Sequence, residues 1–319
     1  MCHRIIDLTE PGSHPKLSIQ PTLVSTAIYV STFISCYYFA DALTEVSLGH
    51  MLWDVWLPIY TMLEMFGLTK EQLLVTRYPS ASDAPQTNQA LEMLFGFPHR
   101  TTPNELLSIP DSQSNYVCAS HGASGFGWLT DHGVGSHGWD ARDLEYPVNL
   151  RRGPELRRLR NYMLSNVGLP TETKLQAPFQ ITFSINSSRN QKRRIDFRDE
   201  IAAVMGSLQL PNGTVTVSSS HVVSLSIMKQ LEVAAKTAIY ISAAGGGTVP
   251  AYFLPRGATL ILYGDRDSYL DFDLFNNYGQ VRVHWMSLTS RHNDTNVLLA
   301  LIRDELDTLT RSSSQQHNM

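Results

Sequence analysis

Residues 226–264 read SIMKQLEVAAKTAIYISAAGGGTVPAYFLPRGATLILYG, and this stretch decides the fold that we predict. A helix is expected over Ser226–Ala235, followed by a short strand of β-rich apolar residues over Thr237–Ser242. Three glycines and a second short helix then lead to a buried strand over Ala258–Tyr263, and Thr248 is expected to cap that second helix. The stretch therefore predicts a unit of helix, strand, glycine turn, helix and strand.

The glycine turn Gly245-Gly246-Gly247 is the candidate ligand site of this unit. Glycines let backbone N–H groups approach a ligand because no side chain stands in the way. A turn of this kind between a strand and a helix N-terminus is suited to phosphate or another anion. The stretch contains neither G-x-G-x-x-G nor G-x-x-x-x-G-K-[ST], so a tight connection without a ligand is an equal alternative on spacing alone.

The rest of the C-terminal half repeats the alternation of strands and helices. The expected strands are Phe179–Ile185, Thr214–Ser218 and Val281–Met286, and the expected further helices are Asp196–Met205 and the amphipathic Thr295–Arg311. Such alternation predicts an α/β fold with a parallel sheet of Rossmann type, whose ligands bind at the carboxyl ends of the strands. Ser312–Met319 is expected to be a disordered tail.

The N-terminal half is expected to contain buried strands, a helix and long loops. Leu23–Ala40 just reaches the length of a membrane span, but its hydroxyl and β-branched residues favour adjacent buried strands. Gly49–Leu68 has apolar residues at helical spacing, with Pro58 bending or dividing the helix. A short helix over Thr87–Phe95 and a strand over Tyr116–Ala119 follow.

His121–Gly138 is rich in glycine and histidine, and Asp131 and Asp140 belong to the same region. These residues offer groups that bind metals, but their spacing matches no established metal motif. A flexible loop is therefore the favoured interpretation, with a metal site as the alternative.

Gly153–Leu169 is predicted to be a helix with Pro154 in its first turn and Gly168 near its end. Three arginines in this helix and one just before it are expected to form a face exposed to solvent. They are Arg152, Arg157, Arg158 and Arg160. The alternative is that one of these arginines faces a ligand. Because the pattern changes after Pro170, we expect the first domain to end at Leu169.

Composition narrows the classes of protein. The chain has 319 residues, enough for two domains, and its net charge of −4 without a basic stripe makes a nucleic-acid partner unexpected. The cysteines Cys2, Cys36 and Cys118 fit no zinc pattern, which leaves either a Cys36–Cys118 disulfide or free thiols. Three N-x-[ST] sequons, which start at residues 186, 212 and 293, are compatible with a secretory lumen.

The order of residues in the central stretch resembles the C-terminal signature of the family 61 glycosyltransferases. Ser226, Gln230, Gly245, Gly247 and Phe253–Ala258 (FLPRGA) carry the resemblance, and the match from Ser226 to Ala258 needs no gap. The family includes EGF-domain O-GlcNAc transferases and plant xylosyl- and arabinosyltransferases.

The resemblance implies the GT-B arrangement, two Rossmann-like domains that face a cleft. Residues 1–169 would form the acceptor-side domain, and residues 170–319 the nucleotide-sugar-binding domain with its C-terminal helix. The implied activity is inverting transfer of a sugar from a nucleotide sugar, such as UDP-GlcNAc or UDP-xylose, to a hydroxyl of a protein or glycan. The resemblance leaves open whether a divalent cation accompanies the diphosphate, and no residue is assigned as a metal ligand.

The implied donor site combines the glycine turn and the threonine that follows it with residues from two other segments. They are Arg189, Arg194, Gln230, Gly245, Gly246, Gly247 and Thr248. Arginine suits a diphosphate because its fork donates two parallel hydrogen bonds; an exposed basic turn is the alternative. The chain departs from the family at Asn186, where the family has arginine, at Ala244, where it has histidine, and at Pro250, where it has asparagine.

His50 and Asp54 resemble the family's G-H-x-x-x-D helix, with Ser47 in place of the usual asparagine. Residues four apart share one helical face, so Asp54 would orient His50 as the base that takes the proton of the acceptor hydroxyl. A purely structural role for both residues is the alternative.

The resemblance also implies a location and an alternative function. Members of the family work in the lumen of the Golgi or endoplasmic reticulum and usually begin with a membrane anchor and a stem. Neither is recognisable here, so we expect either a truncated product or a fragmentary gene model, and a missing N-terminal anchor would allow membrane association. A catalytically inactive relative that binds a glycan or a protein is the alternative function, favoured by Asn186 and Ala244.

Overall fold

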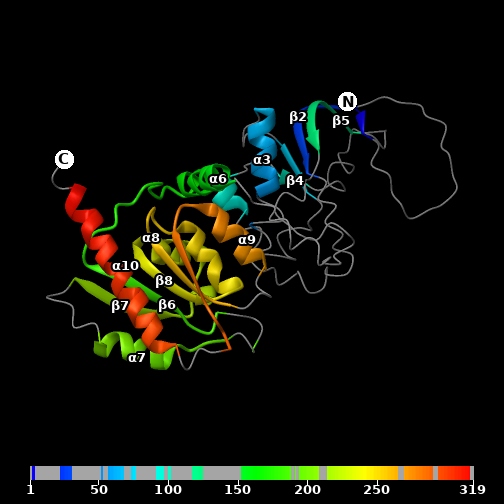
Figure 1. Cartoon of the computed structure of the whole chain (residues 1–319). Helices are drawn as coiled ribbons and strands as arrows, with labels where there is room; N and C mark the ends of the chain where they lie inside the picture. Colours follow the sequence, from blue (N-terminus) through cyan, green and yellow to red (C-terminus); the bar gives the residue numbers. More distant parts are fainter. Residues whose placement is uncertain are drawn as a thin grey trace. The chain divides into compact units, whose positions relative to one another are not determined.

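The computed structural model of the chain divides it into two compact units, residues 1–46 with 50–130 and residues 47–49 with 131–319, which are described separately below (Figure 1). The described residues are 2–3, 22–30, 52, 57–67, 73–76, 91–96, 100–101, 117–124, 152–187, 191, 194–207, 214–264, 269–289 and 294–316.

The first unit contains a five-stranded sheet with the order β1-β5-β2-β3-β4. Its strands are β1 (Cys2–His3), β2 (Thr22–Val30), β3 (Leu73–Thr76), β4 (Arg100–Thr101) and β5 (Val117–Ser124). The pairs β2–β3, β2–β5 and β3–β4 are parallel, and only β1 is antiparallel to its neighbour β5. Numbered along the chain from β2, the parallel strands have the order 3-2-1-4, which matches the first four strands of the Rossmann order 3-2-1-4-5-6.

Most predictions for the described part of this unit are confirmed and one is wrong. β2 confirms a strand within the uncharged segment, and α3 (Leu57–Phe66) confirms a helix in which Pro58 occupies the first turn. β5 confirms the strand expected over Tyr116–Ala119, but the loop expected from His121 is wrong for His121–Ser124, which continue this strand. Pairing with β2, with His121 opposite Thr26, overrides the low strand propensity of Gly122. A short helix, η3 (Leu91–Phe95), lies within the predicted helical segment.

The second unit is an α/β structure around a five-stranded, entirely parallel sheet with the order β10-β9-β8-β6-β7. Its strands are β6 (Phe179–Ser184), β7 (Val215–Ser220), β8 (Thr237–Ala243), β9 (Thr259–Tyr263) and β10 (Arg282–Met286). The parallel, Rossmann-like sheet was predicted from the alternation of strands and helices, and it is confirmed. In chain order the sheet reads 2-1-3-4-5, so its topological switch point lies between β6 and β8.

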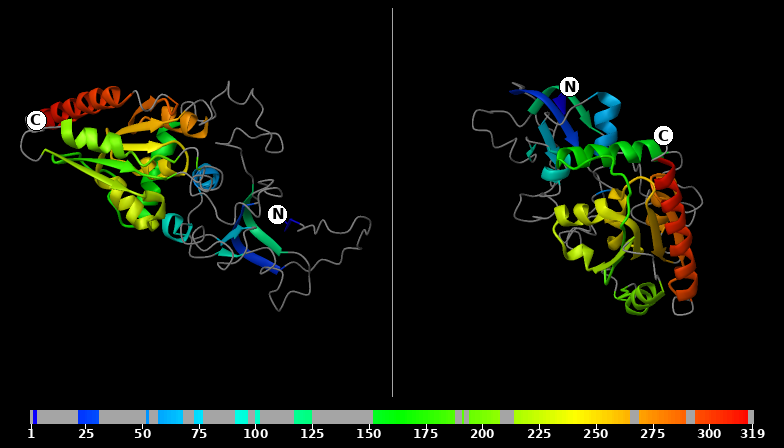
Figure 2. Two further views of the ribbon diagram at one scale, coloured as in Figure 1. Left: turned by 90° about the horizontal axis from the view of Figure 1, so that it is seen from below. Right: turned by 90° about the vertical axis from the view of Figure 1, so that its left-hand side faces the viewer.

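Helices cover both faces of this sheet (Figures 1 and 2). On one face, α7 (Arg198–Ser207) and α10 (Thr295–Gln316) enclose the main hydrophobic core with side chains such as Ile181, Ile239 and Ile261. On the other face, η8 (Gly246–Phe253) packs on β8, and further helices pack around η8. They are α6 (Gly153–Asn166), α8 (Ile227–Lys236) and α9 (Tyr269–Tyr278).

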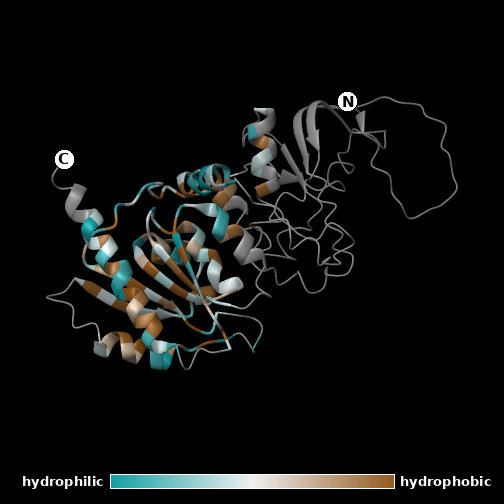
Figure 3. Cartoon of the chain, in the orientation of Figure 1, coloured by the Kyte–Doolittle hydropathy of each residue, from teal (hydrophilic) through white to brown (hydrophobic). Residues whose placement is uncertain are grey.

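Burial of both faces of the sheet explains why its central strands could be predicted from the sequence. Every residue of β8 and β9 is buried, and parallel strands covered on both sides are near-continuous apolar runs. Figure 3 shows the hydrophobic residues concentrated in these strands, whereas α6 and α10 alternate hydrophilic and hydrophobic residues. Within the described residues, no helix is both long and apolar enough to cross a membrane.

One expectation for the C-terminal unit is wrong. Residues 312–316 belong to α10 rather than to a disordered tail, because Leu306 and Leu309 pack on the sheet and carry the helix onward.

Arg160 corrects the prediction of a solvated arginine face on α6. Its side chain is buried, with 1% exposure, and donates hydrogen bonds to Thr171 O (2.7 Å), Phe253 O (3.2 Å) and Leu254 O (3.1 Å). Arg157, in contrast, forms an exposed ion pair with Glu172, as the prediction required. Arg160 thus joins α6 to the end of η8, whereas the domain boundary expected at Leu169 would assign α6 to the first domain.

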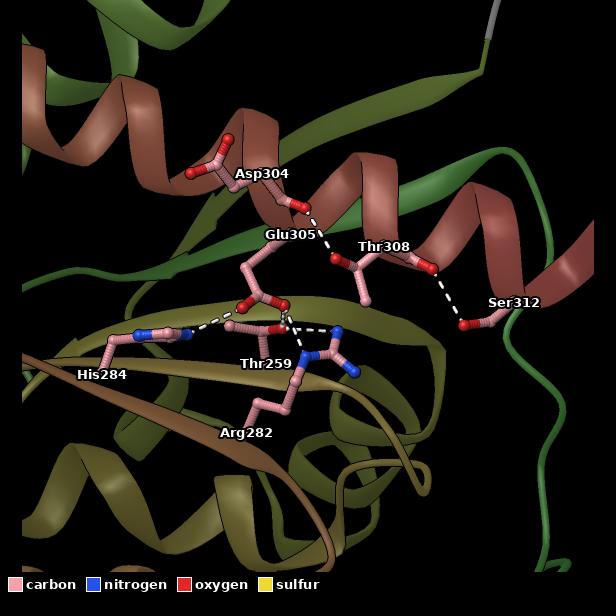
Figure 4. A network of polar contacts seen from close by, with 7 residues as sticks. All are labelled: Thr259, Arg282, His284, Asp304, Glu305, Thr308 and Ser312. Atoms are coloured by element: carbon pink, nitrogen blue, oxygen red, sulfur yellow. Dashed lines mark hydrogen bonds and ion pairs between the residues drawn. The ribbon is translucent and has the colours of Figure 1, made fainter.

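A polar cluster fixes α10 to the edge of the sheet at the amino ends of the strands (Figure 4). Glu305 Oε2 accepts hydrogen bonds from Thr259 Oγ1 (2.6 Å) and Arg282 Nε (2.6 Å), and Glu305 Oε1 lies 2.7 Å from His284 Nε2. Burial raises the pKa of Glu305, but hydrogen bonds from Thr259, Arg282 and His284 outweigh it and leave the pKa below its ordinary value. The carboxylate is therefore ionised and stabilising at neutral pH.

Glu305→Gln is expected to lower the free energy of unfolding by about 1–3 kcal/mol at pH 7, because hydrogen bonds to a charged group are lost. A carboxyl whose pKa is depressed by folding stabilises the protein above its unfolded pKa and loses this effect as the pH falls through the folded pKa. The difference between variant and wild type should therefore shrink below about pH 4.5, the ordinary value. Urea unfolding between pH 3 and 7 measures it.

Asp304→Asn is the matched control, because Asp304 is the exposed neighbour of Glu305 on the same helix (Figure 4). It should change the free energy of unfolding by less than about 0.5 kcal/mol. An equal loss in both variants, or a Glu305→Gln loss that does not depend on pH, would contradict the assigned role of the carboxylate.

Candidate functional site

The carboxyl ends of β6 and β8 meet at the switch point, where doubly wound sheets bind their ligands. The glycine turn follows β8 directly, and Gly245 caps η8 with φ 117° and ψ −148°. Residues with a side chain rarely adopt this backbone conformation. Gly245 is therefore required for the sharp change of direction from strand to helix.

Gly247 lies in direct contact with the ends of β6 and β8. A Cβ atom added to Gly247 would lie 2.5 Å from Ser187 Cβ and 2.7 Å from Ser242 Oγ. A Cβ on Gly246 would meet only Ser187 O, at 3.8 Å. The turn therefore needs glycine at position 247 for close packing, whereas position 246 has room for a small side chain.

Buried hydroxyl groups beneath the turn hold it in place. Tyr240 on β8 donates a hydrogen bond to Gly247 O (2.8 Å), and Ser184 Oγ and Ser187 Oγ lie 2.5 Å apart. Ser187 Oγ also donates to Ile185 O (3.0 Å). Burial raises the pKa of Tyr240, and this outweighs the opposing hydrogen bond from Ser184, so the phenol keeps its proton and remains a donor.

Two backbone donors of the turn are not used by the described part of the chain. Within the described part of the chain, the N–H groups of Gly246 and Gly247 have no hydrogen-bond acceptor. They belong to the first turn of η8, where donors without an intrahelical partner carry a partial positive charge. Gly246 is also partly exposed. This end of η8 is therefore suited to an oxyanion.

Thr248 has a different role from the one predicted. It is the third residue of η8 and not the cap. Both its hydroxyl (2.6 Å) and its N–H (2.9 Å) donate to Gly245 O. The hydroxyl is thus engaged inside the turn, because the tighter 3₁₀ geometry brings it back to the cap carbonyl.

The other predicted donor-site residues lie around the turn or outside the described residues. Gln230 is buried and donates to Leu225 O (2.9 Å), so it fixes the start of α8, which packs against η8. Arg194 is exposed in the connection after β6. The predicted residues His50, Asp54 and Arg189 lie outside the described residues.

Asn186 occupies the end of β6, where the resembled family has arginine. It is exposed and has φ 50°, a left-handed conformation that asparagine adopts more readily than most residues. Its N–H donates to Ile195 O (2.7 Å), which brings the neighbouring Arg194 close to the end of β6. Ala244 is buried, and its N–H donates to Tyr263 O (2.9 Å).

The hydroxyl network and one histidine at the same edge of the sheet were not predicted from the sequence. Ser184 is the last residue of β6 and Ser242 is the last but one of β8, and hydroxyls at strand ends were the signal that could have found them. His221 directly follows β7 and is exposed. A histidine at the carboxyl end of a predicted strand was a comparable signal, but the strand was expected to end at Ser218.

Comparisons with known proteins add no family. No family model matches the chain, and no curated protein matches it. Among the described residues, no group of three or more His, Cys, Asp or Glu side chains is placed to hold a metal ion. The candidate site therefore rests on the glycine turn, the serines beneath it and the residues around the ends of β6, β7 and β8.

Proposed function

We propose that the chain is a glycosyltransferase that moves a sugar from a UDP-sugar, such as UDP-GlcNAc or UDP-xylose, to a hydroxyl of a protein or glycan, with inversion. One observation carries the proposal: the glycine turn at the switch point of a parallel sheet offers two backbone N–H groups without acceptors among the described residues. The resemblance of the same stretch to the family 61 glycosyltransferases supplies the substrate class.

The proposed chemistry places charge stabilisation at the turn. The N–H groups of Gly246 and Gly247 would bind the donor diphosphate and stabilise the charge that develops on it as it leaves. Arg194, near the end of β6, would add a charge-assisted hydrogen bond. His50, oriented by Asp54, would take the proton of the acceptor hydroxyl. The GT-B arrangement of the two units and the work in a secretory lumen are parts of this proposal.

Calorimetric titration with UDP and an assay of UDP release from UDP-GlcNAc and UDP-xylose test the proposal. The wild type is expected to bind UDP and to release it from a donor in the presence of acceptor. His50→Ala should keep UDP binding but lose transfer by a factor of roughly 10²–10⁴, because a general base contributes about that much.

His132→Ala is the control for this experiment, because it removes a histidine to which we assign no catalytic role. It should retain normal transfer. Absence of UDP binding by the wild type would refute the nucleotide-sugar site. Full transfer by His50→Ala would refute only the assignment of His50 as the base and would leave the nucleotide-sugar site standing.

A catalytically inactive relative that binds a glycan or protein is the second candidate. Asn186 and the buried Ala244 favour it, because neither can supply the charged or titratable side chain that the family has at its position. Binding of UDP or of a glycan without UDP release from any donor would favour this candidate over the transferase.

A further inference from the structure

His221 lies at the same edge of the sheet as the glycine turn. Ser220, the residue before it, is opposite Ser184 in the β6–β7 pair, and Ser220 O accepts a hydrogen bond from Ile185 N–H (2.9 Å). Adjacent strands are about 4.8 Å apart. On the other side of β6, Gly247 contacts Ser187. His221 and the turn therefore flank the end of β6 from opposite sides.

The backbone of His221 is held firmly while its ring is exposed. His221 precedes the short helix η7 (Val222–Ser224), which packs against η8, and Val222 is fully buried. Ser224 Oγ donates to His221 O (2.7 Å). The imidazole is exposed and has no hydrogen-bond partner among the described residues. The His221 imidazole therefore lies at the carboxyl ends of the strands without a hydrogen bond that would give it a structural role among the described residues.

The charged groups around this edge come from the connection after β6 and from α8. η8 has no charged residue and the end of β6 has Asn186, whereas the connection after β6 has Asp196 and four basic residues, of which the structure describes only Arg194. The first turns of α8 have Lys229, which is paired with Glu232 (2.6 Å). The diphosphate of a nucleotide sugar carries one negative charge on each phosphate, and the N–H groups of the turn supply only partial charges.

We propose that His221 binds the donor diphosphate as an imidazolium, so that donor binding tightens as the pH falls. The proposal rests on the proposed function, which supplies the diphosphate. Histidine changes charge between about pH 5 and 8, and an imidazolium N–H forms a charge-assisted hydrogen bond with a phosphate oxygen. His221 thereby stands in for the arginine that the end of β6 lacks.

Titration of the full chain with UDP-GlcNAc and with UDP-xylose at several pH values from 8.0 to 5.5 tests the inference. Nucleotide sugars are the right probes because both phosphates are diesters, whereas the terminal phosphate of UDP itself titrates in this range. For the wild type we expect the Kd of the bound donor to fall about tenfold between pH 8.0 and 5.5, since a charge-assisted hydrogen bond is worth at least this factor.

Three variants separate the charge of His221 from other effects. His221→Gln should bind at every pH as weakly as the wild type does at pH 8.0, and His221→Lys should bind tightly throughout. Lys236→Gln removes an exposed cation at the end of α8, next to the start of β8 and therefore at the far edge of the sheet. It should keep the pH dependence of the wild type.

The outcomes distinguish the inference from the proposed function. Donor binding with the same pH dependence in wild type and His221→Gln would overturn the role of His221 and leave the proposed function standing. Binding by His221→Lys no tighter than by His221→Gln would also overturn it. No binding of either nucleotide sugar by the wild type at any pH would overturn both.

Discussion

Gly247→Ala is expected to lower the free energy of unfolding by about 1–3 kcal/mol and to weaken UDP binding at least tenfold. The added Cβ would lie 2.5 Å from Ser187 Cβ and 2.7 Å from Ser242 Oγ, so the turn or the ends of the strands must move. Both serines are buried and cannot swing aside. Because the same turn carries the donor N–H groups, its displacement reaches the proposed diphosphate site. Urea unfolding and calorimetric titration with UDP measure the two effects.

Gly246→Ala is the matched control in the same turn. Its Cβ would have only Ser187 O as a neighbour, at 3.8 Å, which is an ordinary contact. We therefore expect a change of less than about 0.5 kcal/mol in stability and a change of less than threefold in UDP affinity. Equal behaviour of the two alanine variants would show that close packing at Gly247 does not control the turn.

The sheet of the C-terminal unit was predictable because its central strands are apolar on both faces. β8 lies between a helix and the glycine turn, and β9 follows the helical segment after that turn. The predicted ends of both strands differ from the observed ends by at most one residue. Helix ends with local signals were also predictable. Ser226 caps α8, accepting from Lys229 N–H, and Gly168 takes the left-handed conformation (φ 71°) just beyond α6.

Features that depend on tertiary contacts could not be predicted from local patterns. Arg160 has a sequence context typical of a solvated helix face, and only the distant carbonyls of η8 explain its burial. The last turn of α10 is polar in sequence and becomes helical because the preceding residues pack on the sheet. Serine and threonine hydroxyls there bond to carbonyls one turn earlier, as Ser312 does with Thr308 O (2.9 Å).

Only part of the candidate site could be derived from the sequence. The glycine turn was identified because three consecutive glycines stand between a predicted strand and a predicted helix, although a connection without a ligand was an equal alternative on spacing alone. The serines that contact it were missed, since Ser187 and Ser242 are 55 positions apart and meet only through the β6–β8 pairing. Their contact also decides which glycine is essential for packing, namely Gly247 rather than Gly246. Strand order must therefore be known before a role can be given to a hydroxyl at a strand end.

The second large effect is expected for Arg160→Met, which should lower the free energy of unfolding by about 3–5 kcal/mol. The variant leaves Thr171 O, Phe253 O and Leu254 O without a donor that they have in the wild type. Removing one partner of a buried hydrogen bond costs roughly 1–3 kcal/mol for each group left unpaired, and such costs are not fully additive. For a unit of this size the melting temperature should fall by roughly 10 °C.

Arg157→Met, three residues earlier on α6, is the control, because its exposed ion pair with Glu172 should contribute less than about 1 kcal/mol. The comparison also tests whether α6 supports the site, since Arg160 holds the last carbonyls of the helix whose first turn presents the glycine N–H groups. UDP affinity should therefore fall in Arg160→Met at temperatures where the variant is still folded, and remain unchanged in Arg157→Met. A stable Arg160→Met protein with normal UDP affinity would mean that η8 keeps its position without the arginine, and that α6 is only a cover over the sheet.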